Sequence, residues 1–294
     1  MEFEVKGIIP AMVTPFNKRG KINKGVLRDL TNHLIKGGVH GLFPIGSTGE
    51  FYGLSRKQKK EVIETVLEEV NSRVPVYAGS GQITTRDTIA VTKMVEAIGV
   101  DAVSIITPMF IKPDQDELYN HYRAIASSVN LPILLYNNPA RTGINLSAQL
   151  VARLSKIDNI VGIKDSSGDM TLTAEFIQRT ETNFSILAGL DTFILSTLVY
   201  GGKGSISSTA NIAPMLSVKI YEEYYKGNME EARQAQFSLA PLRQAFNLGT
   251  FPVVIKEGLK LIGIDCGPTL EPVKSLGKEK RSRLKNILKE IGVI

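Results

Sequence analysis

A lysine ends an apolar run near the middle of this 294-residue sequence, and its placement suits chemistry. Residues 159–165 read NIVGIKD, and a turn rich in Ser, Gly and Asp follows. A short apolar run bounded by turn residues predicts a buried strand, with Lys164 at its end. Burial disfavours the charged form of an amine, and a neutral amine attacks ketones to form a Schiff base. From this stretch alone, an equal alternative is a lysine that reaches solvent or pairs with Asp165.

Polar residues also follow other apolar runs. Ser47 and Thr48 come directly after one run, Tyr136 ends another, and Arg141 lies five residues further on. A phenol and two hydroxyls can move protons beside a Schiff base. Each also has an ordinary explanation, because Ser and Thr suit turns, a tyrosine ring can pack in a core, and an arginine can lie on the surface. The combination at one place would favour catalysis.

The elements that position these residues form a regular series. Short apolar runs alternate with amphipathic helical patterns, and most runs are apolar throughout, which is typical of parallel strands covered on both faces. The predicted strands are residues 7–13, 41–45, 74–78, 101–106, 132–136, 159–164, 183–187 and 204–207. Eight such units predict a (β/α)₈ TIM barrel, an α/β fold whose chemistry sits at the C-terminal ends of the strands. The candidate residues would therefore meet at one face.

Beyond the eighth run the pattern becomes purely helical. We predict helices at residues 213–225, 229–246, 252–262 and 278–291. The basic stretch 278–289 carries apolar residues at helical spacing, so we interpret it as the solvated face of a terminal helix. The predicted division is a barrel at residues 1–225 and a C-terminal helical extension at residues 226–294, packed on the barrel.

Composition narrows the possible partners and location. The net charge is +6, but Lys and Arg are spread along helical patterns without a basic-aromatic cluster, so we expect no nucleic-acid partner. No apolar run reaches the ~18–20 residues needed to span a bilayer, and we expect no membrane partner. The first residues lack a signal-peptide pattern, and one cysteine, Cys266, excludes an internal disulfide. We therefore expect a cytoplasmic protein with an inert thiol.

The sequence contains few of the usual features that could bind a metal or a nucleotide. Three well-separated histidines and one cysteine do not make an ordinary zinc site, and His40 precedes a strand, which favours a structural role. The glycine fingerprints for dinucleotides and for phosphate loops are missing. We therefore expect no metal and no cofactor. An imine is then the favoured way to stabilise a carbanion.

The sequence resembles the dihydrodipicolinate synthase and N-acetylneuraminate lyase family of pyruvate-dependent class I aldolases. The resemblance covers nearly the whole chain. Its motifs are PAMVTPF at 10–16, GSTGE at 46–50, YNNP at 136–139, GIK at 162–164 and GGKG at 201–204. The family resemblance implies a lyase that acts on pyruvate and an aldehyde, and a homotetramer or homodimer.

The resemblance also implies individual roles. Lys164 forms the imine with pyruvate, and Tyr136 shuttles protons. Ser47 and Thr48 hold the pyruvate carboxylate and relay protons to Tyr136. The backbone contacts to the pocket come from Gly189 and Ile206.

The second substrate is less constrained. Arg141 matches the synthases of the family, in which an arginine grips the carboxylate of aspartate semialdehyde, so the favoured activity is 4-hydroxy-tetrahydrodipicolinate synthase in lysine biosynthesis. Phe110 stands where the synthases usually have a relay tyrosine, while Ser47 and Asp165 lean toward the lyases. The alternative is an aldolase for a 2-keto-3-deoxy sugar acid or an N-acetylneuraminate-type substrate. An alternative of another class is a non-catalytic barrel that binds pyruvate as a regulator.

Overall fold

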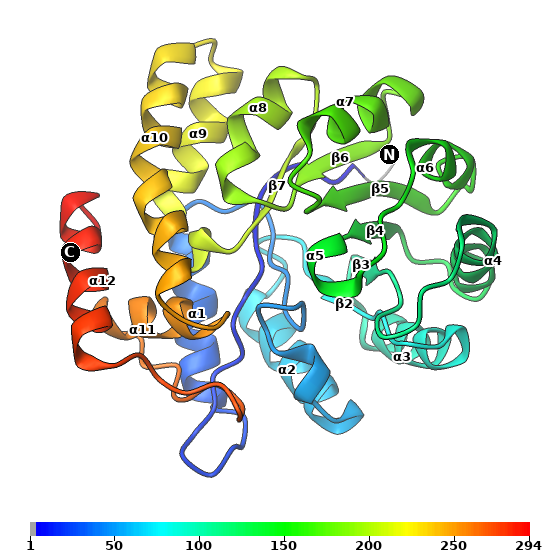
Figure 1. Cartoon of the computed structure of the whole chain (residues 1–294). Helices are drawn as coiled ribbons and strands as arrows, with labels where there is room; N and C mark the ends of the chain where they lie inside the picture. The colour runs from blue at the N-terminus through cyan, green and yellow to red at the C-terminus, as the bar shows by residue number, and fades with distance from the viewer. Residues whose placement is uncertain (1–3) are drawn as a thin grey trace.

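The computed structural model describes residues 4–294, which form a curled sheet of parallel strands ringed by helices (Figure 1). The sheet order is β1-β7-β6-β5-β4-β3-β2, and every pairing is parallel. The strands are β1 (Gly7–Pro10), β2 (Tyr77–Gly79), β3 (Ala102–Ile106), β4 (Ile133–Asn137), β5 (Ile160–Asp165), β6 (Ser185–Ala188) and β7 (Gly204–Ser207). Each of these strands lies within or beside one of the predicted runs.

The remaining predicted strand, residues 41–45, closes the ring between β1 and β2. It does so through two isolated parallel bridges, Ala11 with Phe43 and Leu42 with Val76. Pro44 has no N–H to donate, and Ile45 has a left-handed φ of 49°, so the ladder ends after two residues. The predicted barrel is confirmed, with one strand shorter than expected.

Two apolar layers hold the barrel together. Alternation along each strand sends Ile8 outward to the helices and Ile9 inward. The outer layer contains most of the buried residues and joins the sheet to its helices. The inner layer fills the barrel with Val5, Ile9, Ala11, Phe43, Tyr77, Ala102, Leu134, Leu187 and Ile206. The barrel is therefore a packed core, and its open space lies only at its ends.

Helices follow the strands in the predicted alternation. The barrel helices are α1 (Lys24–Lys36), α2 (Arg56–Val70), α3 (Thr85–Ile98), α4 (Gln115–Ala126), α5 (Pro139–Thr142), α6 (Ala148–Leu154), α7 (Met170–Arg179), α8 (Ile194–Val199) and α9 (Pro214–Tyr225). Short 3₁₀ turns are η1 (Phe51–Gly53), η2 (Asp191–Phe193), η3 (Thr209–Asn211) and η4 (Phe246–Leu248). Helix α2 begins at Arg56 because Ser55 and Gln58 form a capping box.

The C-terminal part forms α10 (Met229–Ala245), α11 (Val253–Leu261) and α12 (Lys278–Glu290). Helix α10 packs against α9, and α12 packs against both α10 and α11 (Figure 1). Leu284 and Leu288 are the buried residues of α12, while its Lys side chains and Arg283 are exposed, as predicted for the basic stretch. Arg281 is half-buried and pairs with Glu257 of α11. We keep the division at residue 226 as a proposal, because α10 continues the packing of the barrel's own last helix.

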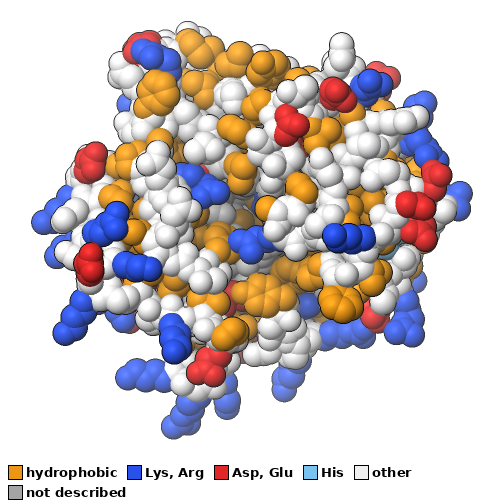
Figure 2. Space-filling model, viewed as in Figure 1, with side chains coloured by type: hydrophobic (Ala, Val, Ile, Leu, Met, Phe, Trp, Pro, Cys, Tyr) orange, Lys and Arg blue, Asp and Glu red, His pale blue; other side chains and the backbone are white. Residues whose placement is uncertain are grey.

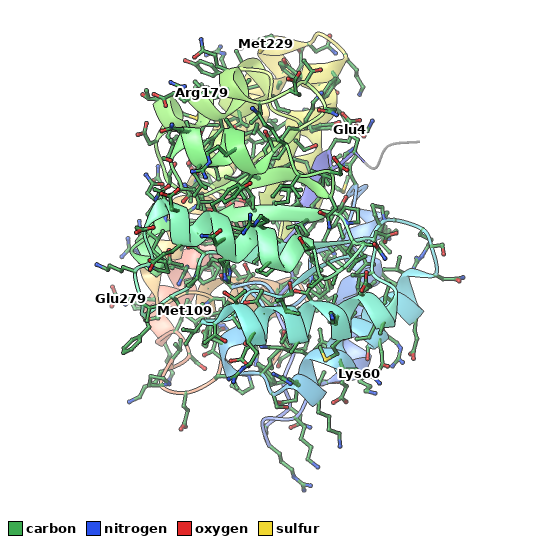
Figure 3. All side chains as sticks on the ribbon, turned by 90° about the vertical axis from the view of Figure 1, so that its right-hand side faces the viewer. Glu4, Lys60, Met109, Arg179, Met229 and Glu279 are labelled. Atoms are coloured by element: carbon green, nitrogen blue, oxygen red, sulfur yellow. The ribbon has the colours of Figure 1, made fainter. Side chains whose placement is uncertain are left out.

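The two ends of the barrel are distinct. Figure 3 shows Met109, which follows β3, at the end opposite Glu4, which precedes β1. His40 lies at the Glu4 end, where its Nδ1 accepts a hydrogen bond from the Ile8 N–H at 3.1 Å. Its ring also packs against Tyr221 with 4.6 Å between centroids, which suits the expected structural role. No helix within residues 4–294 has the length and apolar character to cross a membrane.

Candidate active site

Tyr136 and Lys164 are direct neighbours across the β4–β5 ladder, where their Cα atoms are register partners. Leu135 and Ile163, one residue before each, belong to the outer core, so alternation turns both polar side chains into the barrel. The Lys164 Nζ lies 4.2 Å from the centroid of the Tyr136 ring and 5.6 Å from that of Phe43. The strand register alone therefore brings an amine and a phenol together.

Lys164 is 4% exposed, yet within residues 4–294 no carboxylate lies within ion-pair distance of its Nζ. Asp165 points the other way and accepts hydrogen bonds from Asn137 Nδ2 at 3.0 Å and Ser167 Oγ at 2.9 Å. Thr173 Oγ1 donates a further bond at 2.7 Å. The alternative in which Lys164 pairs with Asp165 is therefore wrong, and the amine faces the open end of the barrel.

The Tyr136 hydroxyl lies in a dense polar network. It accepts a hydrogen bond from Asn138 Nδ2 at 2.7 Å and also bonds with Ser47 and Ser166. Burial by itself would raise the pKa of Tyr136, but the charge of Lys164 and these hydrogen bonds outweigh it and lower the pKa. A phenol with a lowered pKa suits proton transfer better than an ordinary tyrosine does.

Ser47, and not Thr48, supplies the hydroxyl beside Tyr136. Thr48 is buried, and its Oγ1 lies 3.3 Å from Ser208 Oγ. The turn itself is held by a hydrogen bond from Thr14 Oγ1 to the Gly49 carbonyl at 2.7 Å. Thr48 therefore lines the cavity without a hydrogen bond to Tyr136 in the described structure.

A buried ion pair fixes the end of the same turn. Glu50 has a left-handed φ of 56°, and its fully buried carboxylate lies 2.7 Å from Lys256 Nζ on α11. It also accepts a hydrogen bond from the Leu270 N–H at 2.7 Å, while Lys256 donates to the Pro268 carbonyl at 2.8 Å. Burial lowers the pKa of Lys256, and Glu50 offsets part of that shift. The C-terminal helices thus hold the turn that carries Ser47.

The open end of the barrel forms a cavity of about 690 Å³, visible as a hollow at the centre of the face in Figure 2. The predicted residues that line it are Ser47, Thr48, Tyr136, Arg141, Lys164 and Gly189. A Cβ at position 189 would collide with Ser166 Oγ, so glycine is needed there. Ile206 is fully buried in the inner core of the barrel and does not line this cavity.

Arg141 lies on the short helix α5. Its guanidinium carbon lies 4.5 Å from the ring centroid of Phe251, which arrives from the segment between α10 and α11. Phe110 is 94% exposed and has a φ of 76°, and it does not line the cavity. The two residues on which the choice of second substrate depends are therefore in very different surroundings.

Sequence reasoning missed several cavity residues. Ser166 could have been found, because a residue two positions after Lys164 returns to the inner face of the strand end. Asn138 lies in a recognised motif but carried no separate signal. Asp191, Arg243 and Phe251 gave no signal, because their positions depend on how the C-terminal helices pack. Within residues 4–294, no cluster of three or more His, Cys, Asp or Glu side chains could hold a metal.

Known proteins resemble this chain in sequence and in structure over nearly their whole length. A protein of Methanopyrus kandleri named 4-hydroxy-tetrahydrodipicolinate synthase is 39% identical over 296 residues, covering 100% of this chain and 99% of the relative. The crystal structure of dihydrodipicolinate synthase from Thermotoga maritima has a TM-score of 0.96 and 31% identity, covering 99% of this chain and 100% of that one.

A third similar protein was solved with a ligand. It is a prophage protein of the dihydrodipicolinic acid synthase family from E. coli K12, in complex with pyruvate, with a TM-score of 0.95 and 33% identity. The comparison covers 98% of this chain and 99% of the prophage protein. A sequence model of the dihydrodipicolinate synthetase family matches residues 4–291. This chain therefore belongs to the dihydrodipicolinate synthetase family.

Proposed function

We propose that this protein is a Schiff-base enzyme that condenses pyruvate with aspartate semialdehyde, as a 4-hydroxy-tetrahydrodipicolinate synthase in lysine biosynthesis. The observation that carries the proposal is Lys164, a buried amine without a carboxylate partner in the described chain, which faces a cavity beside Tyr136. The name of the Methanopyrus kandleri relative supports the same reaction.

The chemistry begins at Lys164. The unprotonated amine attacks the carbonyl carbon of pyruvate, and Tyr136 gives a proton to the hydroxyl that leaves as water, which yields a protonated imine and a phenolate. The imine withdraws electrons from the neighbouring methyl group, so that the Tyr136 phenolate can take a methyl proton through the hydroxyl network it shares with Ser47. The resulting enamine carbon attacks the aldehyde, which forms the new carbon–carbon bond and restores the imine. Proton return from Tyr136 neutralises the alkoxide that forms. The amino group of aspartate semialdehyde then attacks the imine carbon, which closes the ring and releases Lys164 as a free amine.

The two carboxylates of the substrates have separate partners in this proposal. Ser47 and Thr48 hold the carboxylate of pyruvate at the turn after residue 45, on the Lys164 side of the cavity. Arg141 holds the carboxylate of aspartate semialdehyde with its planar fork. Its stacking on Phe251 limits the orientations of the guanidinium before the substrate arrives.

A substitution at Arg141 tests the named substrate. Arg141→Ala should cost about 2–4 kcal/mol in kcat/KM for aspartate semialdehyde, the scale for truncating one partner of a desolvated charge pair. Steady-state assays with pyruvate and a panel of aldehydes measure this. A wild-type enzyme that uses a sugar-acid substrate far better than aspartate semialdehyde contradicts the named reaction and leaves the imine chemistry in place.

Phe110 favours a second candidate, an aldolase for a 2-keto-3-deoxy sugar acid or an N-acetylneuraminate-type substrate. A phenyl ring cannot carry a proton, so the relay tyrosine of the synthases has no counterpart at this position. Phe110→Tyr should raise synthase turnover if aspartate semialdehyde is the substrate and should have no useful effect if it is not. A pyruvate-binding regulator without turnover is the remaining alternative, and it would give no product with any aldehyde.

We also propose a homodimer or homotetramer of this chain. Phe110 is 94% exposed and the adjacent Ile111 is 45% exposed, and side chains of this kind are commonly covered by a second protein surface. Light scattering coupled to gel filtration would measure the mass directly. A monomer at micromolar concentration contradicts this proposal. The cytoplasmic location stays a prediction.

A further inference from the structure

Arg243 reaches the same cavity from the C-terminal helix α10. Its guanidinium carbon lies 5.2 Å from the ring centroid of Phe246, and its side chain is 28% exposed. Within residues 4–294 the guanidinium donates no hydrogen bond that meets ordinary distance and angle limits. The four N–H donors of its two terminal nitrogens are therefore available to a molecule in the cavity.

Asp191 is the acidic residue that pairs with Arg243 among residues 4–294, and its other oxygen, Oδ1, is held by a separate set of hydrogen bonds. Asp191 Oδ1 accepts hydrogen bonds from Ser207 Oγ, from the Ser208 N–H at 2.9 Å and from Thr209 Oγ1 at 2.8 Å. Asp191 Oδ2 lies 3.7 Å from Arg243 Nε, well beyond the 2.7–2.9 Å that is typical of a charge-assisted hydrogen bond. Asp191 thus orients Arg243 electrostatically and leaves its terminal nitrogens free.

Arg243 and Arg141 are held in the same way by one segment. Arg141 stacks on Phe251 at 4.5 Å, and Arg243 stacks on Phe246 at 5.2 Å. The two rings pack edge to face with 6.3 Å between their centroids. The segment between α10 and α11 therefore carries both supporting rings, and Figure 2 shows Lys and Arg side chains around the central hollow.

We propose that Arg243 is a second specificity-determining residue, which binds the acidic end of the aldehyde together with Arg141. The inference rests on the proposed condensation of pyruvate with an aldehyde. Two guanidiniums on ring supports, both lining the cavity that contains Lys164, match an aldehyde with a carboxylate. A neutral sugar-type aldehyde has no anionic group that either guanidinium could bind.

The test compares Arg243→Gln with wild type on three aldehydes. The aldehydes are aspartate semialdehyde, succinate semialdehyde, which keeps the carboxylate without the amine, and glyceraldehyde, which has no charge. We expect kcat/KM to fall on the order of tenfold or more for both acidic aldehydes, the scale of one charge-assisted hydrogen bond. For glyceraldehyde we expect a change of less than about twofold.

Two variants control for charge and for folding. Arg243→Lys keeps the charge beside Asp191 and loses the planar fork, so it should recover only part of the loss. Arg233→Gln removes another arginine of α10 that stacks on an aromatic ring, Phe237 at 5.6 Å, but it does not line the cavity and should behave as wild type. Trapping of the pyruvate imine with borohydride should be the same in all of these proteins.

An equal loss for acidic and neutral aldehydes, or no loss for any of them, overturns the role of Arg243. If wild type uses succinate semialdehyde but not aspartate semialdehyde, and Arg243→Gln loses that activity selectively, the role of Arg243 stands while the named reaction fails. A wild-type enzyme that accepts only neutral aldehydes overturns both. The reverse case, full synthase activity that is indifferent to Arg243→Gln, removes the inference and leaves the proposed function intact.

Discussion

Two lysines of this protein are buried to the same degree and differ in their partners. Lys164 is 4% exposed and lies 4.2 Å from the centre of the Tyr136 ring. Lys256 is 3% exposed and lies 4.4 Å from the centre of the Phe16 ring. Lys256 also has the Glu50 carboxylate at 2.7 Å, whereas no carboxylate of the described chain pairs with Lys164.

The difference teaches that burial alone does not make a lysine reactive. A buried amine with an opposite charge beside it is held in a fixed ion pair, and the carboxylate occupies the position that a substrate would need. A buried amine that faces a cavity without such a partner is open to the carbonyl carbon of a ketone. Lys256 therefore stabilises the turn at residues 46–50 through its ion pair with Glu50, and Lys164 is the proposed nucleophile.

Removing the amine of Lys164 should give the largest effect. Lys164→Ala should lower kcat by about 10⁴-fold or more, because no imine forms. Incubation with pyruvate and borohydride, followed by mass spectrometry, should find a reduced three-carbon adduct on Lys164 in wild type and none in the variant. An adduct on Lys256 or on any other lysine would contradict the assignment of Lys164 as the nucleophile.

Tyr136→Phe should have the next largest effect and lower kcat by about 10²–10⁴-fold, the range for loss of a general acid–base group. The ring that packs against Lys164 remains, so the imine should still form and trap. Stopped-flow trapping together with steady-state assays separates imine formation from the later proton transfers. Turnover near wild type in a folded variant would mean that protons take another route.

Lys256→Met should lower the free energy of unfolding more than it lowers turnover. It leaves the Glu50 carboxylate buried without its partner, and we expect a loss of about 3–5 kcal/mol in the free energy of unfolding. The double variant Glu50→Gln with Lys256→Met should recover part of that loss, because the uncompensated charge is gone. Urea denaturation measures both. A single variant as stable as wild type would show that the pair is not structural.

Lys59 sharpens the comparison, and we expect the smallest effect there. It is 4% exposed and makes a long hydrogen bond of 3.5 Å to Gln82, and burial lowers its pKa. It lines none of the cavity beside Tyr136. Lys59→Met should change the free energy of unfolding by less than about 1 kcal/mol and leave turnover unchanged. A pyruvate adduct on Lys59 would mean that burial is enough without a cavity.

The sequence predicts one of these lysines much better than the other. Lys164 interrupts an apolar run at a strand end, and the regular alternation of strands and helices indicates which end of the barrel it faces. Lys256 also follows an apolar run, residues 252–255, but that run begins a predicted helix. Nothing local marks Lys256 as buried and Lys260 as a surface residue, although Lys260 pairs at the surface with Asp265. Its burial follows from the packing of α11 on a turn 200 residues earlier.

The other differences between the predicted and the observed structure have the same cause, because they also depend on contacts that the local sequence does not show. Residues 41–45 were expected as a full strand, but the left-handed backbone at Ile45 ends the pairing and belongs to the turn that carries Ser47. The resemblance implied a backbone contact from Ile206 to the pocket. The Ile206 side chain lies in the inner core, and the backbone contact stays a prediction. Arg243 could not be predicted, because only tertiary packing brings its helix to the cavity. Features encoded within one strand were predictable, and contacts between distant segments were not.

The β4–β5 register has a consequence for how such an enzyme can evolve. Tyr136 and Lys164 are spaced by adjacent strands about 4.8 Å apart, so their geometry is inherited with the barrel itself. Arg141 and Arg243 come from a four-residue helix and from the C-terminal helices, outside that ladder. Substitutions there can change which aldehyde is accepted while the imine chemistry survives. A mutant library directed at new acceptors should therefore vary residues 139–143 and 243–251 and leave the strands and Asn138 untouched.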